Sequence, residues 1–128
     1  MSLIKKIKDK KVNFEFNKEY LKVVTTKIAN NDAQFITNSF NEMHPADAAD
    51  IIELLDQYDR ESLIKLNNFN IDPEVFIELN ESVQSEIITY LSSDSIVKLL
   101  KNLESDDAIA ILENVAEKDK NAILSSLP

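Results

Sequence analysis

Glycine and cysteine are both absent from this sequence, which also contains only three prolines and one histidine. Without glycine, tight hairpin turns that need a positive φ have few candidate residues, so a β-sheet protein is disfavoured. Without cysteine, neither a disulfide framework nor a zinc–thiolate site can form. No stretch approaches the roughly 18 uncharged apolar residues expected of a membrane-spanning helix. These absences favour an all-helical protein that is not a secreted mini-protein.

Acidic residues outnumber basic residues in this chain, 23 to 14. Its 128 residues suit one domain, and their formal net charge is −9. Basic residues are concentrated before Asp32, so the body that follows is strongly acidic. We expect this body to repel nucleic acid and anionic lipid and to attract cations or basic surfaces. An alternative is that the charge only keeps the protein soluble.

The chain divides into a lead-in and a domain. Residues 1–16 form a basic lead-in that we expect to be partly disordered, without the sustained amphipathic pattern of a membrane-surface helix. Residues 17–128 form the domain. Apolar residues at helical spacing predict a first helix over Asn17–Ile28. A second helix is predicted over Ala33–Glu42, with Asp32 as its cap, burying three apolar side chains. These are Phe35, Ile36 and Phe40.

From residue 43 onward the sequence repeats itself. The next helix is expected to start at Pro45, with Asp47 and Asp50 near the positive end of its dipole. It would carry an apolar stripe of Ile51, Ile52, Leu54 and Leu55. Apolar residues then close short runs about 12 residues apart. They are Leu55, Leu66, Leu79, Leu91, Leu103, Val115 and Leu127.

Each repeat opens on polar or acidic residues and continues for about eight residues, as in the run that ends at Ile87-Ile88. A helix this short is unstable alone and persists only when it packs on neighbours. The pattern therefore predicts an all-α fold, a right-handed superhelix or solenoid of short helices with a period of about 12 residues.

Catalysis has little support in this sequence. The one histidine, His44, precedes Pro45 at a helix entry, where a capping or packing role is expected rather than that of a base. A glycine-rich phosphate loop is impossible, and no serine has a nucleophile-elbow context. We therefore expect no enzyme. The aromatic residues fit core packing, although a peptide groove is an open alternative. They include Phe35, Phe40, Tyr58, Phe69, Phe76 and Tyr90.

The acidic residues have two compatible interpretations. Carboxylates at helix starts cap N–H groups and complement the dipole. This explains Asp47, Asp59, Asp72, Asp94 and Asp106. Magnesium, however, binds carboxylate oxygens and often keeps several waters while touching only one or two of them. Clustered carboxylates could therefore bind Mg²⁺ weakly, most plausibly when a second acidic domain completes the site.

The string His44-Pro45-Ala46-Asp47-Ala48-Ala49-Asp50-Ile51-Ile52-Glu53-Leu54-Leu55, with the short helices that follow it, resembles the N-terminal cytosolic domain of the MgtE magnesium transporter family. The resemblance covers roughly residues 20–128. It implies a cytoplasmic domain of a plasma (inner) membrane protein, followed by paired CBS domains, a plug helix and a transmembrane pore in a homodimer. Those later segments are not in this chain, so we expect an excised domain or a stand-alone relative.

The resemblance also implies a mechanism and a cofactor. Mg²⁺ bound between this domain and the CBS domains would screen their acidic surfaces and favour a closed pore. Two metal-facing acids of the family fall on Glu74 and Asp106, and a third falls on Ala110, where Asp107 could substitute. The expected partners are the CBS domains and a second copy, with neither nucleic acid nor membrane insertion by this segment. The alternative is an interaction scaffold without metal sensing, because short-helix domains of the flagellar switch protein FliG resemble this fold class.

Overall fold

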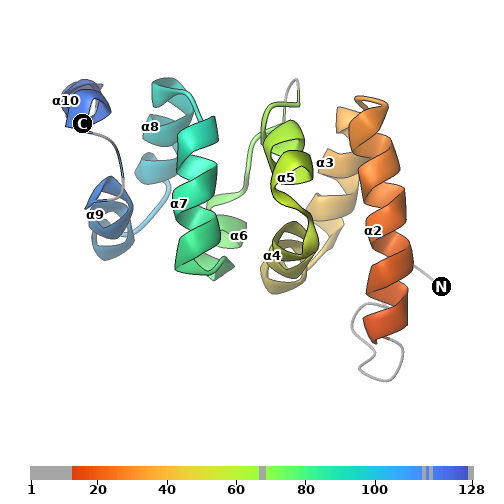
Figure 1. Cartoon of the computed structure of the whole chain (residues 1–128). Coiled ribbons are helices and arrows are strands. Elements are labelled where there is room, and N and C mark those ends of the chain that lie inside the picture. Colours follow the sequence, from red (N-terminus) through yellow and green to blue (C-terminus); the bar gives the residue numbers. More distant parts are fainter. Residues whose placement is uncertain (1–12, 67–68, 114, 116, 127–128) are drawn as a thin grey trace.

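A computed structural model describes residues 13–66, 69–113, 115 and 117–126, and within these ranges every regular element is a helix. The helices stand side by side in a row, with α2 at one end and α10 at the other (Figure 1). Their bounds are α2 Asn13–Ala29, α3 Ala33–Glu42, α4 Pro45–Leu54, α5 Gln57–Ile64, α6 Pro73–Glu78, α7 Glu81–Tyr90, α8 Ser93–Lys101, α9 Ser105–Glu113 and α10 Glu117–Ser126. The all-helical class is confirmed for these residues.

Half of the connections between successive helices in Figure 1 are junctions of only two residues. At Leu79-Asn80, the leucine is the C-cap residue of α6 and the asparagine is the N-cap residue of α7. Both are extended, with ψ angles of 149° and 158°. The leucine is buried, while the asparagine side chain accepts a hydrogen bond from Val83 N–H. The same arrangement recurs at Met43-His44 and Leu55-Asp56, and at Leu91-Ser92 with a leucine that is only partly buried.

This junction explains how the chain turns without glycine. An extended backbone is open to every residue type, so no residue with positive φ is needed. The apolar residue enters the core and the polar one satisfies a free N–H group of the next helix. Leu55, Leu79 and Leu91, three of the leucines that mark the repeat in the sequence, are therefore C-cap residues at helix ends.

The turn between α2 and α3 differs, because Asn31 adopts φ 57°. Its N–H donates to the Ile28 carbonyl, and the Asp32 N–H donates to the Lys27 carbonyl, the pair of bonds that ends a helix in a Schellman motif. Asparagine tolerates this left-handed conformation better than other non-glycine residues. Asp32 then caps α3 by accepting from Phe35 N–H at 3.1 Å, as the sequence predicted.

One apolar core runs along the row, and the buried residues described in it are all apolar. Its most deeply buried side chains include Phe76, Ile36, Ile51, Leu63 and Ile87. Helices two places apart in sequence pack together, as α4 does with α6, α5 with α7 and α8 with α10. Stacking of this kind is required by helices of six to ten residues, which are too short to be stable alone.

Helix starts at Glu81, Ser93, Ser105 and Glu117 are each 12 residues apart. The starts of α3, α4 and α5 at Ala33, Pro45 and Gln57 are also 12 residues apart, whereas α6 departs from this spacing because a longer connection precedes Pro73. The right-handed superhelical path stays a prediction. The first helix begins at Asn13, four residues before its predicted start, because phenylalanines do not interrupt a helix. The rest of the basic lead-in, residues 1–12, lies outside the described residues.

Three finer predictions about side chains were wrong. Leu54 is 54% exposed, since it lies about 120° around α4 from the face that buries Ile51, Ile52 and Leu55. Asp47 lies in the first turn of α4, near the positive end of the helix dipole, but Asp50 lies beyond that turn. Phe35 is only partly buried, and the Lys27 ammonium lies 4.8 Å from its ring centre.

Candidate functional site

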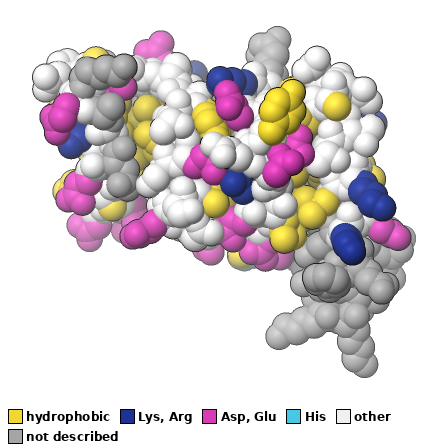
Figure 2. All heavy atoms as spheres, viewed as in Figure 1, with side chains coloured by type: hydrophobic (Ala, Val, Ile, Leu, Met, Phe, Trp, Pro, Cys, Tyr) yellow, Lys and Arg dark blue, Asp and Glu magenta, His cyan; other side chains and the backbone are white. Residues whose placement is uncertain are grey.

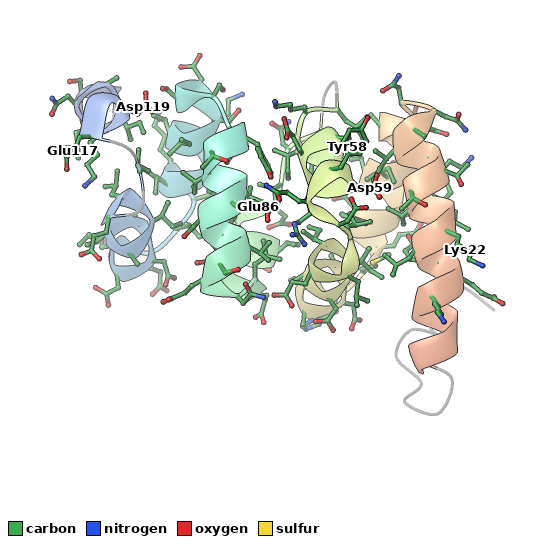
Figure 3. All side chains as sticks on the ribbon, in the orientation of Figure 1. Lys22, Tyr58, Asp59, Glu86, Glu117 and Asp119 are labelled. Atoms are coloured by element: carbon green, nitrogen blue, oxygen red, sulfur yellow. The ribbon has the colours of Figure 1, made fainter. Side chains whose placement is uncertain are left out.

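Carboxylates gather on two parts of the surface. In Figure 2 they line the lower edge of the row, around α4 and α6, and its α9–α10 end. Figure 3 shows Glu117 and Asp119 at that end of the row, whereas Glu86 lies on α7 on the side toward α5. These parts of the surface, together with Glu74 on α6, are the candidate cation-binding regions of the molecule.

The predicted metal ligands are placed on two helices. Glu74 is in the first turn of α6, and Asp106 and Asp107 are in the first turn of α9. Glu74 and Asp106 are exposed and make no ion pair with any described residue, whereas Asp107 is partly buried. Two carboxylates free of counterions are therefore available on this surface.

The exposed face of α9 explains how these residues differ. Ala110 follows Asp106 by four residues, so the two share one exposed face of the helix. Asp107 is the next residue, about 100° further around the helix axis, and it precedes the buried Ile111 by four residues. The carboxylate that Ala110 lacks would have projected beside Asp106, whereas Asp107 is turned further toward the core.

A second group of carboxylates lies where α4 meets α6, and we name it the α4–α6 acidic cluster: Asp47, Asp50 and Glu53 on α4 with Glu78 on α6. Partial burial raises the pKa of Asp50, and the negative charges of Glu53, Asp47 and Glu78 raise it further, in that order. Like charges are therefore already close enough on this face to repel one another. A bound cation would relieve that repulsion.

Sequence reasoning missed this cluster, although part of its signal was present. Carboxylates three residues apart at Asp47, Asp50 and Glu53 must share a face of α4. Glu78 joins them only because α6 packs on α4, which the local sequence does not reveal. Across the described residues, no three His, Cys, Asp or Glu side chains are placed so that they could hold a metal ion. Any tight site would need ligands from elsewhere.

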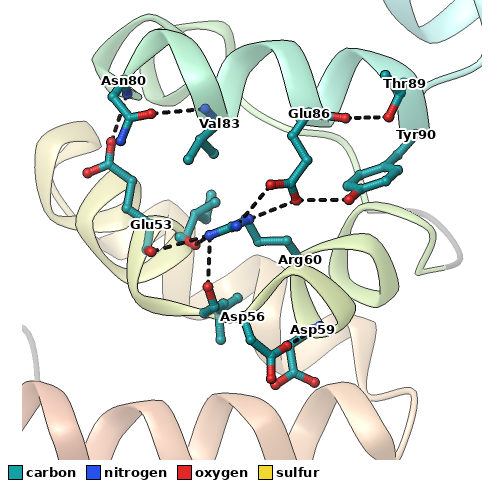
Figure 4. A network of polar contacts seen from close by, with 11 residues as sticks. Glu53, Asp56, Asp59, Arg60, Asn80, Val83, Glu86, Thr89 and Tyr90 are labelled. Atoms are coloured by element: carbon teal, nitrogen blue, oxygen red, sulfur yellow. Dashed lines mark hydrogen bonds and ion pairs between the residues drawn. The ribbon is translucent and has the colours of Figure 1, made fainter.

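A network of polar contacts around Arg60 and Glu86 was also not predicted from the sequence (Figure 4). Arg60 of α5 donates to both carboxylate oxygens of Glu86 on α7, at 2.9 Å each. Its Nη1 also donates to the Leu55 carbonyl at the end of α4, at 2.8 Å. Tyr90 O–H donates to Glu86 Oε2 at 2.8 Å. The Arg60 and Glu86 side chains are only 13% and 19% exposed.

This network is a structural clamp. Hydrogen bonds from Arg60 and then from Tyr90 hold the pKa of the Glu86 carboxyl below its usual value, against the opposing effect of burial. Arg60 is satisfied by α4 and α7 together, so a single guanidinium joins three helices. A paired and nearly buried carboxylate such as Glu86 is not available to bind a cation.

His44 is placed as the sequence predicted for a cap. Its Nδ1 accepts from Ala46 N–H at 3.1 Å at the start of α4, and the side chain is exposed. It lines neither of the two described pockets.

Short capped helices, an apolar core and a carboxylate-rich surface define an acidic, helical domain in the part of the chain that the structure describes. A family model described as the MgtE intracellular N domain matches residues 43–128, from Met43 at the end of α3 onward. The chain therefore belongs to the MgtE intracellular N domain family. No curated protein and no solved structure matches it.

Membership confirms the resemblance to the MgtE family and makes the protein a cytosolic domain of an MgtE magnesium transporter rather than a member of an enzyme family. None of the helices in the described ranges combines the length and apolar character needed to cross a bilayer.

Proposed function

We propose that this domain senses intracellular Mg²⁺ by docking, in an ion-dependent way, onto the CBS domains of the same transporter and so favours the closed pore. The observation that supports the proposal is that Glu74 and Asp106 are exposed carboxylates with no ion pair to any described residue, in a family of magnesium transporter domains. At high Mg²⁺ the ion is shared across the interface. At low Mg²⁺ the two acidic surfaces repel each other and separate.

The chemistry of the donors fits Mg²⁺. The ion prefers oxygen ligands and is often held by one or two carboxylates while it keeps several waters. Glu74, Asp106 and Asp107 would each supply oxygens from a helix start, and the remaining ligands would come from the CBS domains. The absence of any described group of three ligands is consistent with a site divided between two domains.

Electrostatics supplies the switch in this proposal. The chain carries a net charge of −9, and the pKa of Asp50 is raised first by burial and then further by the negative charges of neighbouring carboxylates. A second acidic surface can approach closely only if a cation lies between the two. Ion-dependent docking therefore follows from charge, without a large change inside the domain.

The test measures binding of this domain to the separately expressed CBS domains at increasing Mg²⁺. Association should strengthen with Mg²⁺, and Glu74→Ala with Asp106→Ala should remove that dependence. Glu42→Ala is the matched control, since Glu42 is an exposed carboxylate at the end of α3. If the affinity for the CBS domains does not change with millimolar Mg²⁺, the result would instead support the scaffold alternative.

A further inference from the structure

A groove of about 780 Å³ opens where the connection between α5 and α6 meets the junction of α7 and α8. Its volume is within the range of sites that bind small molecules or short peptide segments. The α7 helix runs from the lower edge of the row to its upper edge (Figure 1), and Tyr90 at the end of α7 lines this groove, which we name the upper groove. The groove is therefore separate from the α4–α6 acidic cluster, none of whose residues lines it.

The floor of this upper groove is apolar and well supported. Leu66 and Leu99 are buried, and Phe69 packs edge-on against the Phe40 ring of α3 with 6.1 Å between the ring centres. Leu91, the partly buried apolar residue of the α7–α8 junction, also lines the groove. A floor of this kind favours a ligand with apolar side chains.

Amide side chains surround the floor. Asn41 and Asn70 line the groove, are exposed and make no side-chain hydrogen bond to another described residue. Asn102 Nδ2 donates to the Lys98 carbonyl at 2.8 Å, which leaves its Oδ1 as an acceptor. An amide offers both a donor and an acceptor, which is what an extended peptide backbone needs from its surroundings.

The two lysines and one aspartate that line the groove give its lining a formal charge of +1, whereas the whole chain carries −9. The lysines are Lys65 and Lys98, and the one acidic lining residue, Asp72, is occupied in capping α6. Lys65 pairs with the exposed Glu61, whereas the Lys98 ammonium has no ion pair among the described residues. Lys98 is therefore an unpaired cation in the lining of the groove, and a carboxylate of a ligand could pair with it.

We propose that the upper groove binds an extended acidic peptide segment of a protein partner, with its apolar side chains on the leucine and phenylalanine floor and a carboxylate on Lys98. This site goes beyond magnesium sensing and does not depend on it. The same groove would fit an inorganic anion less well, because an anion uses neither the apolar floor nor the amides.

The test uses three fluorescein-labelled peptides about eight residues long, in which leucine alternates with aspartate, asparagine or lysine. Binding to the whole chain is followed by fluorescence anisotropy. The aspartate peptide should bind tightest, although the net charge of the protein favours the lysine peptide in any non-specific interaction. Lys98→Glu should weaken binding of the aspartate peptide about tenfold.

Lys101→Glu is the matched control, because Lys101 is exposed on the same last turn of α8 but does not line the groove. It makes the same change in net charge and should alter binding less than twofold. The proposal is wrong if the lysine or asparagine peptide binds as tightly as the aspartate peptide, or if the two substitutions have equal effects. Release of the aspartate peptide by millimolar phosphate alone would show an anion site and would also contradict it.

Discussion

Arg60 of α5 connects this helix to α4 and α7 through one guanidinium group. Its guanidinium is bidentate to Glu86 and also donates to carbonyl groups at the end of α4. Pairs this well shielded from water differ from exposed ion pairs, because losing one partner leaves the other charge without compensation. The exposed pair of Lys65 and Glu61 on α5 offers a direct comparison in the same molecule.

We predict that Arg60→Ala lowers the free energy of unfolding by about 2 to 4 kcal/mol, because Glu86 is left nearly buried and unpaired. Lys65→Ala should cost less than about 0.5 kcal/mol, since its ion pair is solvated. Urea unfolding followed by circular dichroism measures both. Equal effects of the two substitutions would refute the clamp.

Two carboxyl groups should shape the pH dependence of stability in opposite directions. The pKa of Glu86 is lowered in the folded state, so its stabilising contribution is complete above the unfolded pKa of about 4.3 and is lost as pH falls through its folded pKa. The pKa of Asp50 is raised, so its contribution is complete below an unfolded pKa of about 3.9 and is lost as pH rises through its folded value.

Urea unfolding midpoints measured between about pH 3 and pH 7 should therefore depend on pH differently in two variants, because this range includes both unfolded pKa values. Glu86→Gln should make the loss of stability on acidification shallower. Asp50→Asn should raise the midpoint slightly at neutral pH and have no such benefit in acid. A parallel shift of both variants at every pH would mean that neither carboxyl group titrates as inferred.

At the scale of the helices, the two-residue junction is the device that sets the fold. A buried apolar residue followed by a capping residue ends one helix and starts the next, without glycine. Asn80 shows how a junction also joins distant helices. Its side chain caps α7, and its backbone N–H donates to Glu53 Oε2 of α4 at 2.7 Å.

We expect Asn80→Ala to cost about 1 kcal/mol of stability, because the Val83 N–H loses its side-chain acceptor. Asn80→Ser is the control, since serine caps nearly as well, and it should retain most of the stability. Thermal unfolding gives the comparison. If serine and alanine are equally destabilising, then side-chain capping is not what Asn80 contributes.

The local sequence predicts this level of structure well. The Asp32 and His44 caps and the α3 bounds follow from residue types and spacing, because caps are local interactions. What it could not predict comes from contacts between distant segments. Arg60 and Glu86 are 26 residues apart, and Glu78 meets Asp50 only after α6 packs on α4. The predicted metal residues were placed through family resemblance, and their role stays a prediction.

For the molecule as a whole, the acidic surface and the connection to a transporter family are the central facts. We predict that the isolated domain binds Mg²⁺ weakly, because its described carboxylates do not form a group of three and Mg²⁺ needs further ligands. Calorimetric titration measures this affinity. A tight site in the domain alone would contradict a site divided between two domains.

The most direct measurement of ion-dependent docking is limited proteolysis of the linker in a protein that joins this domain to its CBS domains, across a Mg²⁺ titration. The account predicts that Mg²⁺ protects the linker and that Glu74→Ala with Asp106→Ala abolishes the protection, while Glu42→Ala leaves it intact. Equal cleavage of the original protein with and without Mg²⁺ would contradict the account and favour a scaffold that does not sense the ion.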